Sequence, residues 1–153
     1  MPFHRWVSVV LVAASVACSG EEVTNSGGAA DALVVQSLAR PASVTVASPF
    51  DVELTATNVT AAPITFTLSS GCAFAYEIRA SDGRVVAAPT YACTAVLRSV
   101  TLSPGQVLRE TYQYPAGEVG FPRLPIGTYR VVPTVNAGPI RGLVTRAADL
   151  TIR

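Results

Sequence analysis

Lysine is absent from the sequence, and all 11 basic side chains are arginines. This absence excludes the Schiff-base chemistry that needs a lysine amine. Histidine, methionine and tryptophan each occur once, as His4, Met1 and Trp6, near the start of the chain. If export removes that segment, no Ser–His or Ser–Lys catalytic pair and no imidazole or thioether metal ligand remains. We therefore expect that the protein is not an enzyme and that it binds no metal or other cofactor.

Charge is also scarce, since charged residues make up 14% of the sequence and the formal net charge is +1. Removal of Arg5 from the 11 arginines leaves ten, against ten acidic residues. A balanced surface gives no electrostatic reason to bind nucleic acid or an anionic membrane. The apolar share of 50% argues against intrinsic disorder, and 153 residues suit one domain with a real core. We expect a protein partner and no nucleic acid.

The first 17 residues have the pattern of a signal peptide. His4 and Arg5 form a short basic start, and the uncharged apolar run Trp6–Ala17 follows. This run is too short for a membrane-spanning helix, which needs about 20 residues, but it suits the apolar core of a signal peptide. We predict that residues 1–17 are removed on export.

The run ends in Ser15-Val16-Ala17-Cys18, which resembles the bacterial lipobox, where the cysteine is lipidated and becomes the mature N-terminus. Ser15 stands where that motif prefers leucine, and Ser15 and Ala17 also fit ordinary signal-peptidase cleavage. We favour lipidation of Cys18 because Ser19–Ala30 is rich in Gly and Ser, as flexible linkers are. Residues 18–31 are then the lipid-anchor cysteine and its tether. This interpretation predicts a protein of the bacterial cell envelope, periplasmic or surface-exposed, that meets the membrane through its lipid alone. Ordinary cleavage would instead predict a secreted protein.

Cysteine occurs three times, an odd number for an exported protein. A lipid on Cys18 leaves Cys72 and Cys93 as a pair, which should form a disulfide outside the cytoplasm. A closed loop of about 20 residues corresponds to a stabilisation of roughly 3 kcal/mol in the chain-entropy model. A zinc site is not expected, because it would want four ligands and no histidine accompanies these thiols.

From residue 33 onward, short stretches of alternating apolar and polar residues are separated by turn signals, which is typical of β-strands. The expected strands cover residues 50–57, 64–68, 74–78, 85–87, 95–102, 107–114, 128–135 and about 143–152. Asp82-Gly83 predicts a hairpin, Pro104-Gly105 a type II turn, and Pro115–Pro125 an irregular loop. Pro133 indicates that its strand lies at a sheet edge or ends early. Residues 32–153 thus predict an all-β, single immunoglobulin-like antiparallel β-sandwich of about seven to nine strands.

Three segments within residues 50–135 share features with a known family. They are Thr57-Asn58 with Ile64–Ser70 and Phe74–Ile78, then Ser81–Val86 with its Asp-Gly hairpin, and finally Leu102–Gln106 with Leu124–Val131. Together they resemble the BsuPI-type intracellular proteinase inhibitor domain, an immunoglobulin-like β-sandwich named after a bacillus serine-protease inhibitor. The resemblance implies the sandwich fold and, as an activity, inhibition of a serine protease. The namesake is cytoplasmic, whereas an export signal and a disulfide are expected here.

Two segments are candidates for presenting a binding loop on a rigid scaffold. One is the Pro115–Pro125 loop, whose Phe121, Arg123 and Leu124 could fill a protease specificity pocket while its prolines restrict the backbone. The other is the segment 72–93, which the disulfide would pre-organise. The predicted function is therefore protein–protein interaction, with a serine protease as the most specific candidate partner. The alternative is a purely structural accessory domain of an envelope assembly, with no inhibitor activity.

Other distinctive residues have structural interpretations. Tyr129 follows a Gly-containing corner and is expected to bond back to the backbone, as in a tyrosine corner. Asn58-Val59-Thr60 matches a glycosylation sequon but is interpreted as a turn. Asp51 and Glu53 share one face of a strand, where a solvated polar face is expected rather than a pair of catalytic carboxylates.

Overall fold

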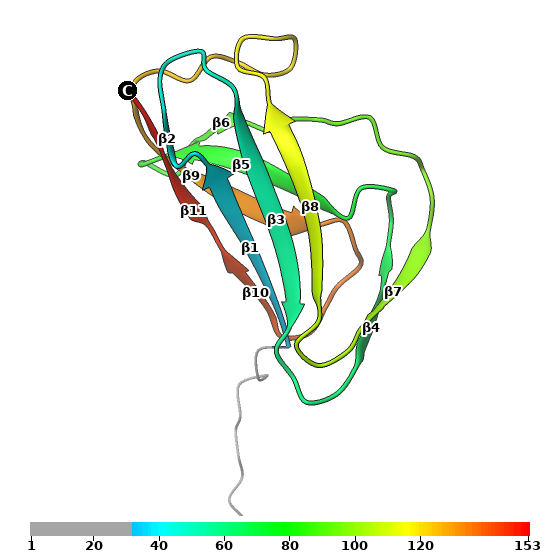
Figure 1. Cartoon of the computed structure of the whole chain (residues 1–153). Coiled ribbons are helices and arrows are strands. Elements are labelled where there is room, and N and C mark those ends of the chain that lie inside the picture. Colours follow the sequence, from blue (N-terminus) through cyan, green and yellow to red (C-terminus); the bar gives the residue numbers. More distant parts are fainter. Residues whose placement is uncertain (1–31) are drawn as a thin grey trace, which may run out of the picture.

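The computed structural model describes residues 32–153, in which the regular secondary structure consists of β-strands. In chain order these are β1 (Leu33–Arg40), β2 (Ser43–Val44), β3 (Phe50–Asn58), β4 (Ile64–Leu68), β5 (Phe74–Ala80), β6 (Val85–Ala87), β7 (Arg98–Leu102), β8 (Val107–Tyr114), β9 (Gly127–Val135), β10 (Leu143–Arg146) and β11 (Ala148–Ile152). Two sheets pack as layers, with β5 and β9 crossing behind β3 and β8 in Figure 1.

The front sheet has four strands in the order β10-β1-β3-β8, and the rear sheet has five in the order β2-β11-β9-β5-β6. β4 and β7 form a separate two-stranded sheet. Two antiparallel-rich sheets around one core are the architecture of an immunoglobulin-like sandwich. The fold class expected from the sequence is therefore confirmed.

The strands number eleven rather than seven to nine, because both ends of the domain are divided between the two sheets. The expected strand 143–152 is interrupted at Ala147, so that β10 pairs with β1 in the front sheet and β11 pairs with β9 in the rear sheet. Likewise β1 belongs to the front sheet, and β2, after the cis Arg40–Pro41 peptide, belongs to the rear sheet. The β1–β10 and β2–β11 pairs are parallel, which corrects the expectation of a purely antiparallel sandwich.

The core lies between the two large sheets and follows the alternation of the sequence. On β3, Phe50, Val52, Leu54 and Ala56 are at most 3% exposed, whereas Asp51 on the other face is exposed. Rear-sheet side chains that belong to the same core are Phe74, Tyr76, Ile78, Tyr129, Val131 and Val135. Full burial of one large apolar side chain stabilises a fold by about 1.5–3 kcal/mol.

Ser37 connects the two sheets beside the interruption at Ala147. The buried Ser37 hydroxyl donates to Val131 O at 2.6 Å and accepts from Ala148 N at 2.9 Å. These bonds join β1 to β9 and to the first residue of β11. A buried polar group thus finds its partners where the chain passes from one sheet to the other.

Pro133 lies in β9, an interior strand flanked by β11 and β5, so the expected edge position is wrong for the strand as a whole. The strand also does not end early, because it continues to Val135. Pairing with β11 stops at Val131, however, while pairing with β5 continues to Val135. One flank of β9 is therefore open beyond Val131, and a residue without an N–H group is tolerated there.

The expected turns are present. β5 and β6 form a hairpin around Asp82-Gly83, with Gly83 at φ 85°. Gly105 has φ 72°, and Gln106 N donates to Ser103 O at 2.9 Å. A positive φ at the third position is what a type II turn requires.

Asn58, the first residue of the sequon, is fully buried at the end of β3. Its Nδ2 donates to Ala62 O and to Leu102 O, both at 2.8 Å, and its Oδ1 accepts from Thr60 N at 2.9 Å. All the side-chain groups of Asn58 are therefore used to close the turn before β4, as the turn interpretation predicts.

Several predictions concern residues that the structure does not describe. The signal peptide 1–17, the lipidated Cys18 and the tether 18–31 lie outside the described residues. Within residues 32–153, no helix is long and apolar enough to cross a membrane.

Candidate functional site

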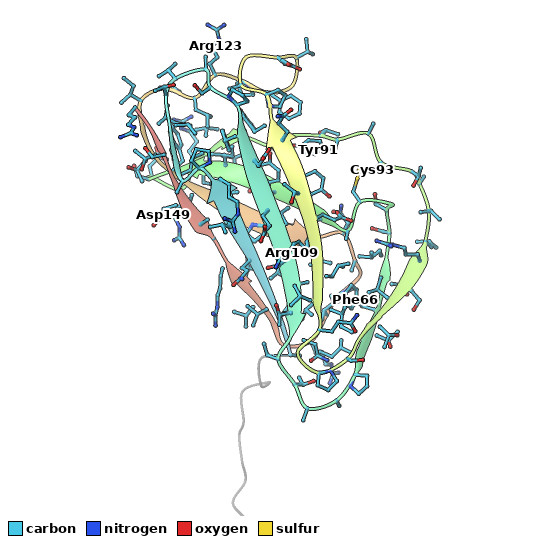
Figure 2. The ribbon with its side chains drawn as sticks, viewed as in Figure 1. Phe66, Tyr91, Cys93, Arg109, Arg123 and Asp149 are labelled. Carbon is cyan, nitrogen blue, oxygen red and sulfur yellow. A yellow bond between two sulfur atoms is a disulfide. The ribbon has the colours of Figure 1, made fainter. Side chains whose placement is uncertain are left out.

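The two segments predicted to bind a partner meet at one end of the sandwich (Figure 2). Tyr91, in the segment between Cys72 and Cys93, packs edge-on against Phe121 of the Pro115–Pro125 loop, with ring centroids 5.6 Å apart. The structure thus joins both segments into one surface, which we call the end surface. It consists of the exposed parts of residues 88–94 and 117–123.

The Cys72–Cys93 disulfide holds the segment after β6 against the start of β5. The two Cα atoms are 5.5 Å apart, and the predicted bond is present. Beside it, Gly71 N donates to Thr94 O at 2.9 Å, and a Cβ at Gly71 would collide with the Thr94 hydroxyl. Residues 88–97 form no strand between β6 and β7, so these contacts and Tyr91 fix their course.

Four tyrosines lie together beside the end surface and form what we call the tyrosine cluster: Tyr76, Tyr91, Tyr112 and Tyr114. The Tyr76 and Tyr91 hydroxyls are 2.7 Å apart, and the Tyr91 and Tyr112 ring centroids are 4.6 Å apart. Burial raises the pKa of all four phenols, and that of Tyr114 reaches about 12. The neutral phenol is therefore favoured throughout the cluster, where it can both donate and accept.

Glu110 is the charged side chain next to the tyrosine cluster. The alternation of β8 turns it to the same side as Tyr112, whose hydroxyl donates to the carboxylate. Ala73 N donates to both carboxylate oxygens at 2.9 and 3.1 Å, and Arg98 lies 4.0 Å away. Glu110 thereby holds the residue that follows Cys72. Glu110 was not among the residues predicted from the sequence, although a carboxylate in the inward-facing register of β8 was the available signal.

Tyrosine hydroxyls also fix the far end of the loop. Tyr114 donates to Pro122 O at 2.6 Å, and Tyr129 donates to Pro125 O at 2.7 Å. The second bond is the backward contact of a tyrosine corner, as expected for Tyr129. The proline-rich half of the loop is therefore attached to β8 and β9 rather than free.

The tip of the loop is a closed turn. Gly117 N donates to Phe121 O at 2.7 Å, and Phe121 N donates to Glu118 O at 2.9 Å. Gly117 and Gly120 have φ of 97° and 83°, a conformation that side-chain-bearing residues rarely adopt. Val119 projects from this turn and is 100% exposed.

The three candidate side chains of the loop do not point the same way. Leu124 is 4% exposed and belongs to the core, and Phe121 is half-buried against the tyrosine cluster. Arg123 is exposed, lies over Gly117 and is seen at the top of Figure 2. Only Arg123 of the three is therefore accessible to a partner. Val119 was missed, although the glycines on both sides of the tip were a signal for a projecting turn.

The carboxylates of β3 lie on the outer face of the front sheet. Glu53 lies 3.6 Å from Arg40 Nε and 3.6 Å from an Arg109 nitrogen, so two arginines engage it. Thr55 on the same face is buried, which makes this face less solvated than expected. Within residues 32–153, no three His, Cys, Asp or Glu side chains come together as a metal site.

The fold and its end surface define an immunoglobulin-like sandwich with a fixed loop at one end. No family model matches the chain, and no curated protein matches it significantly. Among solved structures, it is similar to the CARDB domain of a Pyrococcus furiosus protein in complex with di-metal ions, at 17% identity and TM-score 0.48, over 79% of this chain and 87% of that one.

Two further structures are similar over most of this chain. The alkylpurine DNA glycosylase AlkC from Pseudomonas fluorescens shares 15% identity over 81% of this chain and 31% of that one, with TM-score 0.47. The C-terminal domain of Wzt shares 15% identity over 72% of this chain and 63% of that one, with TM-score 0.45. Because these TM-scores lie below 0.5, no function and no site residue is transferred from these proteins.

Proposed function

We propose that this chain is an exported, non-enzymatic binding protein, lipid-anchored at Cys18 in the bacterial cell envelope, that binds a protein partner through the end surface. The observation that carries the proposal is the fully exposed Val119 on a loop whose proline-rich half is held by buried tyrosines. A loop fixed in one conformation loses little conformational entropy when a partner binds. Its position on a rigid β-scaffold is typical of binding loops.

Site-specific cross-linking tests the end surface directly. A photo-crosslinking residue at position 119 should capture a discrete protein partner in intact envelopes. The same residue at position 85, an exposed valine of β6, is the matched control and should capture none. Equal capture at both positions, or capture at neither, would contradict the assignment of the end surface.

The more specific form of the proposal is inhibition of a serine protease, the activity implied by the resemblance to BsuPI-type domains. Arg123 supports it, because an exposed arginine on a fixed loop suits the acidic specificity pocket of a trypsin-like enzyme. The disulfide and the tyrosine cluster support it too, because an inhibitor loop must keep its shape while bound.

A panel of trypsin-like and subtilisin-like proteases tests this form. Arg123→Ala should weaken inhibition of trypsin-like enzymes by roughly 30-fold or more, the effect of removing one binding hot spot. Arg84→Ala, which changes an exposed arginine in the β5–β6 hairpin, should leave inhibition unchanged. If the wild type is cleaved after Arg123 and inhibits nothing, the inhibitor form is rejected while the binding proposal stands on the cross-linking result.

One observation favours the second candidate, a structural accessory domain of an envelope assembly. Leu97 is 75% exposed and Val96 is 45% exposed, just before the edge strand β7. Apolar side chains beside an open sheet edge are suited to pairing with another chain. Leu97→Asp should then abolish co-purification with envelope proteins, whereas Val119→Asp should not.

Anchoring has its own test. Cys18→Ala should block processing or release the protein from membranes, because the lipid is its proposed membrane contact. Recovery of a soluble mature protein with an unmodified Cys18 would reject lipidation and favour secretion.

A further inference from the structure

A hollow lies where β10 passes into β11. Pairing of β9 with β11 begins at Val131, and the residues before Ala148 belong to the front sheet or to the interruption. The flank of β9 beyond Val131 is consequently left open beside the chain as it changes sheets. A pocket of about 420 Å³ occupies this place, lined in part by Arg79, Ser81, Arg130, Val132, Thr145 and Ala147.

Two arginines lie side by side in the lining of this pocket. Arg79 of β5 and Arg130 of β9 are direct cross-strand partners on the solvent face of the rear sheet. Cβ atoms of such partners lie about 4.5–5.5 Å apart, and like charges directly opposite destabilise a sheet. Both residues line the pocket, so two basic side chains from adjacent strands border it.

Neighbouring acids neutralise only one of the two. Glu77 accepts from Arg79 Nε at 3.0 Å and from its terminal nitrogen at 2.7 Å. Arg130 makes no ion pair within 4.0 Å among residues 32–153. Asp149 is its cross-strand partner on β11 and is exposed, but its carboxylate stays beyond that distance. Arg130 therefore keeps its hydrogen-bond donors available at the pocket.

The rest of the lining defines the shape of a ligand. Ser81 and Thr145 bring hydroxyl groups, whereas Val132, Ala80 and Ala147 bring aliphatic surface. The volume is at the lower end of the roughly 300–1,000 Å³ typical of small-molecule sites, and it exceeds what a bare inorganic ion needs. Guanidinium groups bind carboxylate and phosphate oxygens by paired N–H bonds.

We propose that this pocket binds a small organic oxyanion, a carboxylate or phosphate carried on a compact apolar body. The acidic head lies against Arg79 and Arg130, where it compensates the charge of Arg130 that no neighbouring acid pairs. The apolar body lies against Val132 and Ala147. The site is independent of the proposed partner binding at the end surface.

Titration of the full chain with four probes tests the site. The probes are acetate, benzoate, inorganic phosphate and phenyl phosphate. Binding is measured from the shifts of the amide resonances of residues 79–83 and 130–132. Benzoate and phenyl phosphate should each bind at least tenfold more tightly than acetate and inorganic phosphate, respectively, because only they contact the apolar wall. Whichever of the two binds more tightly identifies the head group as carboxylate or phosphate.

Arg130→Gln should weaken binding of the preferred probe at least tenfold, and raised salt should weaken it in the wild type. Arg109→Gln is the matched control, because Arg109 is an exposed arginine on a strand of the front sheet (Figure 2). This variant should bind the probe as tightly as the wild type does. The melting temperature of each variant verifies that it is folded. Equal affinity of wild type and Arg130→Gln, equal affinity of all four probes, or no binding at millimolar probe would each overturn the proposal.

Discussion

The ring of Tyr91 meets the ring of Phe121 edge-on at 5.6 Å, and the hydroxyl of the same tyrosine donates to Gln113 O at 2.9 Å. One side chain thus ties the segment after β6 to the 115–125 loop and to β8. The disulfide holds the same segment from its other side through Cys93. The two segments of the end surface are therefore held by contacts with each other and with the strands, and removing these contacts should change stability and proteolysis.

Phe121→Ala should lower the free energy of unfolding by about 2 kcal/mol, less than the 3–5 kcal/mol of a fully buried phenylalanine, because Phe121 is half-buried. It should also speed tryptic cleavage after Arg123, because the loop loses its contacts with Tyr91 and Tyr114. Denaturant unfolding and limited proteolysis measure the two effects. Val119→Ala, at the exposed tip, is the control and should change neither the stability nor the rate of cleavage. If the Phe121→Ala loop resists trypsin as well as the wild-type loop does, the Phe121 ring does not hold the loop in place.

Ser37→Ala should destabilise the fold by about 1–3 kcal/mol, because Val131 O and Ala148 N lose a buried hydrogen-bond partner. Denaturant unfolding gives the magnitude, and faster amide exchange at Ala148 gives the location. Ser99→Ala, at an exposed position of β7, should stay within about 0.5 kcal/mol of the wild type. Equal stability of both variants would mean that the passage of the chain from β10 in the front sheet to β11 in the rear sheet does not depend on Ser37.

Asn58→Asp should cost about 2–4 kcal/mol at neutral pH, because an oxygen replaces the donor to Ala62 O and Leu102 O in a buried site. The control is Gln36→Glu, the same amide-to-carboxylate change on an exposed side chain of β1. Thermal or denaturant unfolding compares the two. An Asn58→Asp protein as stable as the control would contradict the role of this amide.

Stability should fall as pH rises above about 10, the ordinary tyrosine pKa. Burial raises the pKa of the clustered tyrosines, and that of Tyr114 to about 12. Between these values the unfolded chain has released phenolic protons that the folded chain keeps, so the slope of unfolding free energy against pH is negative. No lysine is present to titrate in the same range.

Denaturant unfolding at stepped pH, with tyrosinate absorbance recorded in parallel, measures this decline. Tyr114→Phe removes one of the four phenols and should make the decline shallower. Ionisation of all the clustered tyrosines near pH 10 with the fold intact would contradict the predicted protection.

Local signals accounted for the turns and for most strands, but the expected strands did not include β1 and β2. The alternation of Phe50, Val52, Leu54 and Ala56 gave the buried face of β3, because side chains in a strand point alternately to opposite faces. Gly83 and Gly105 marked turns, because those backbone positions need a positive φ. The Cys72–Cys93 pair followed from cysteine parity together with the predicted export and lipidation of Cys18.

The tertiary structure decided which strands are neighbours and which way loop side chains point. The sequence of residues 143–152 does not predict that β10 and β11 join different sheets. The sheet that each strand joins depends on hydrogen bonds to β1 and β9. Phe121 and Leu124 looked like exposed binding residues, but they pack inward because apolar surface beside the tyrosine cluster is available to cover them. Alternation fixes the face of a strand within a few residues, whereas pairing and loop packing depend on contacts between distant segments, which exist only once the chain has folded.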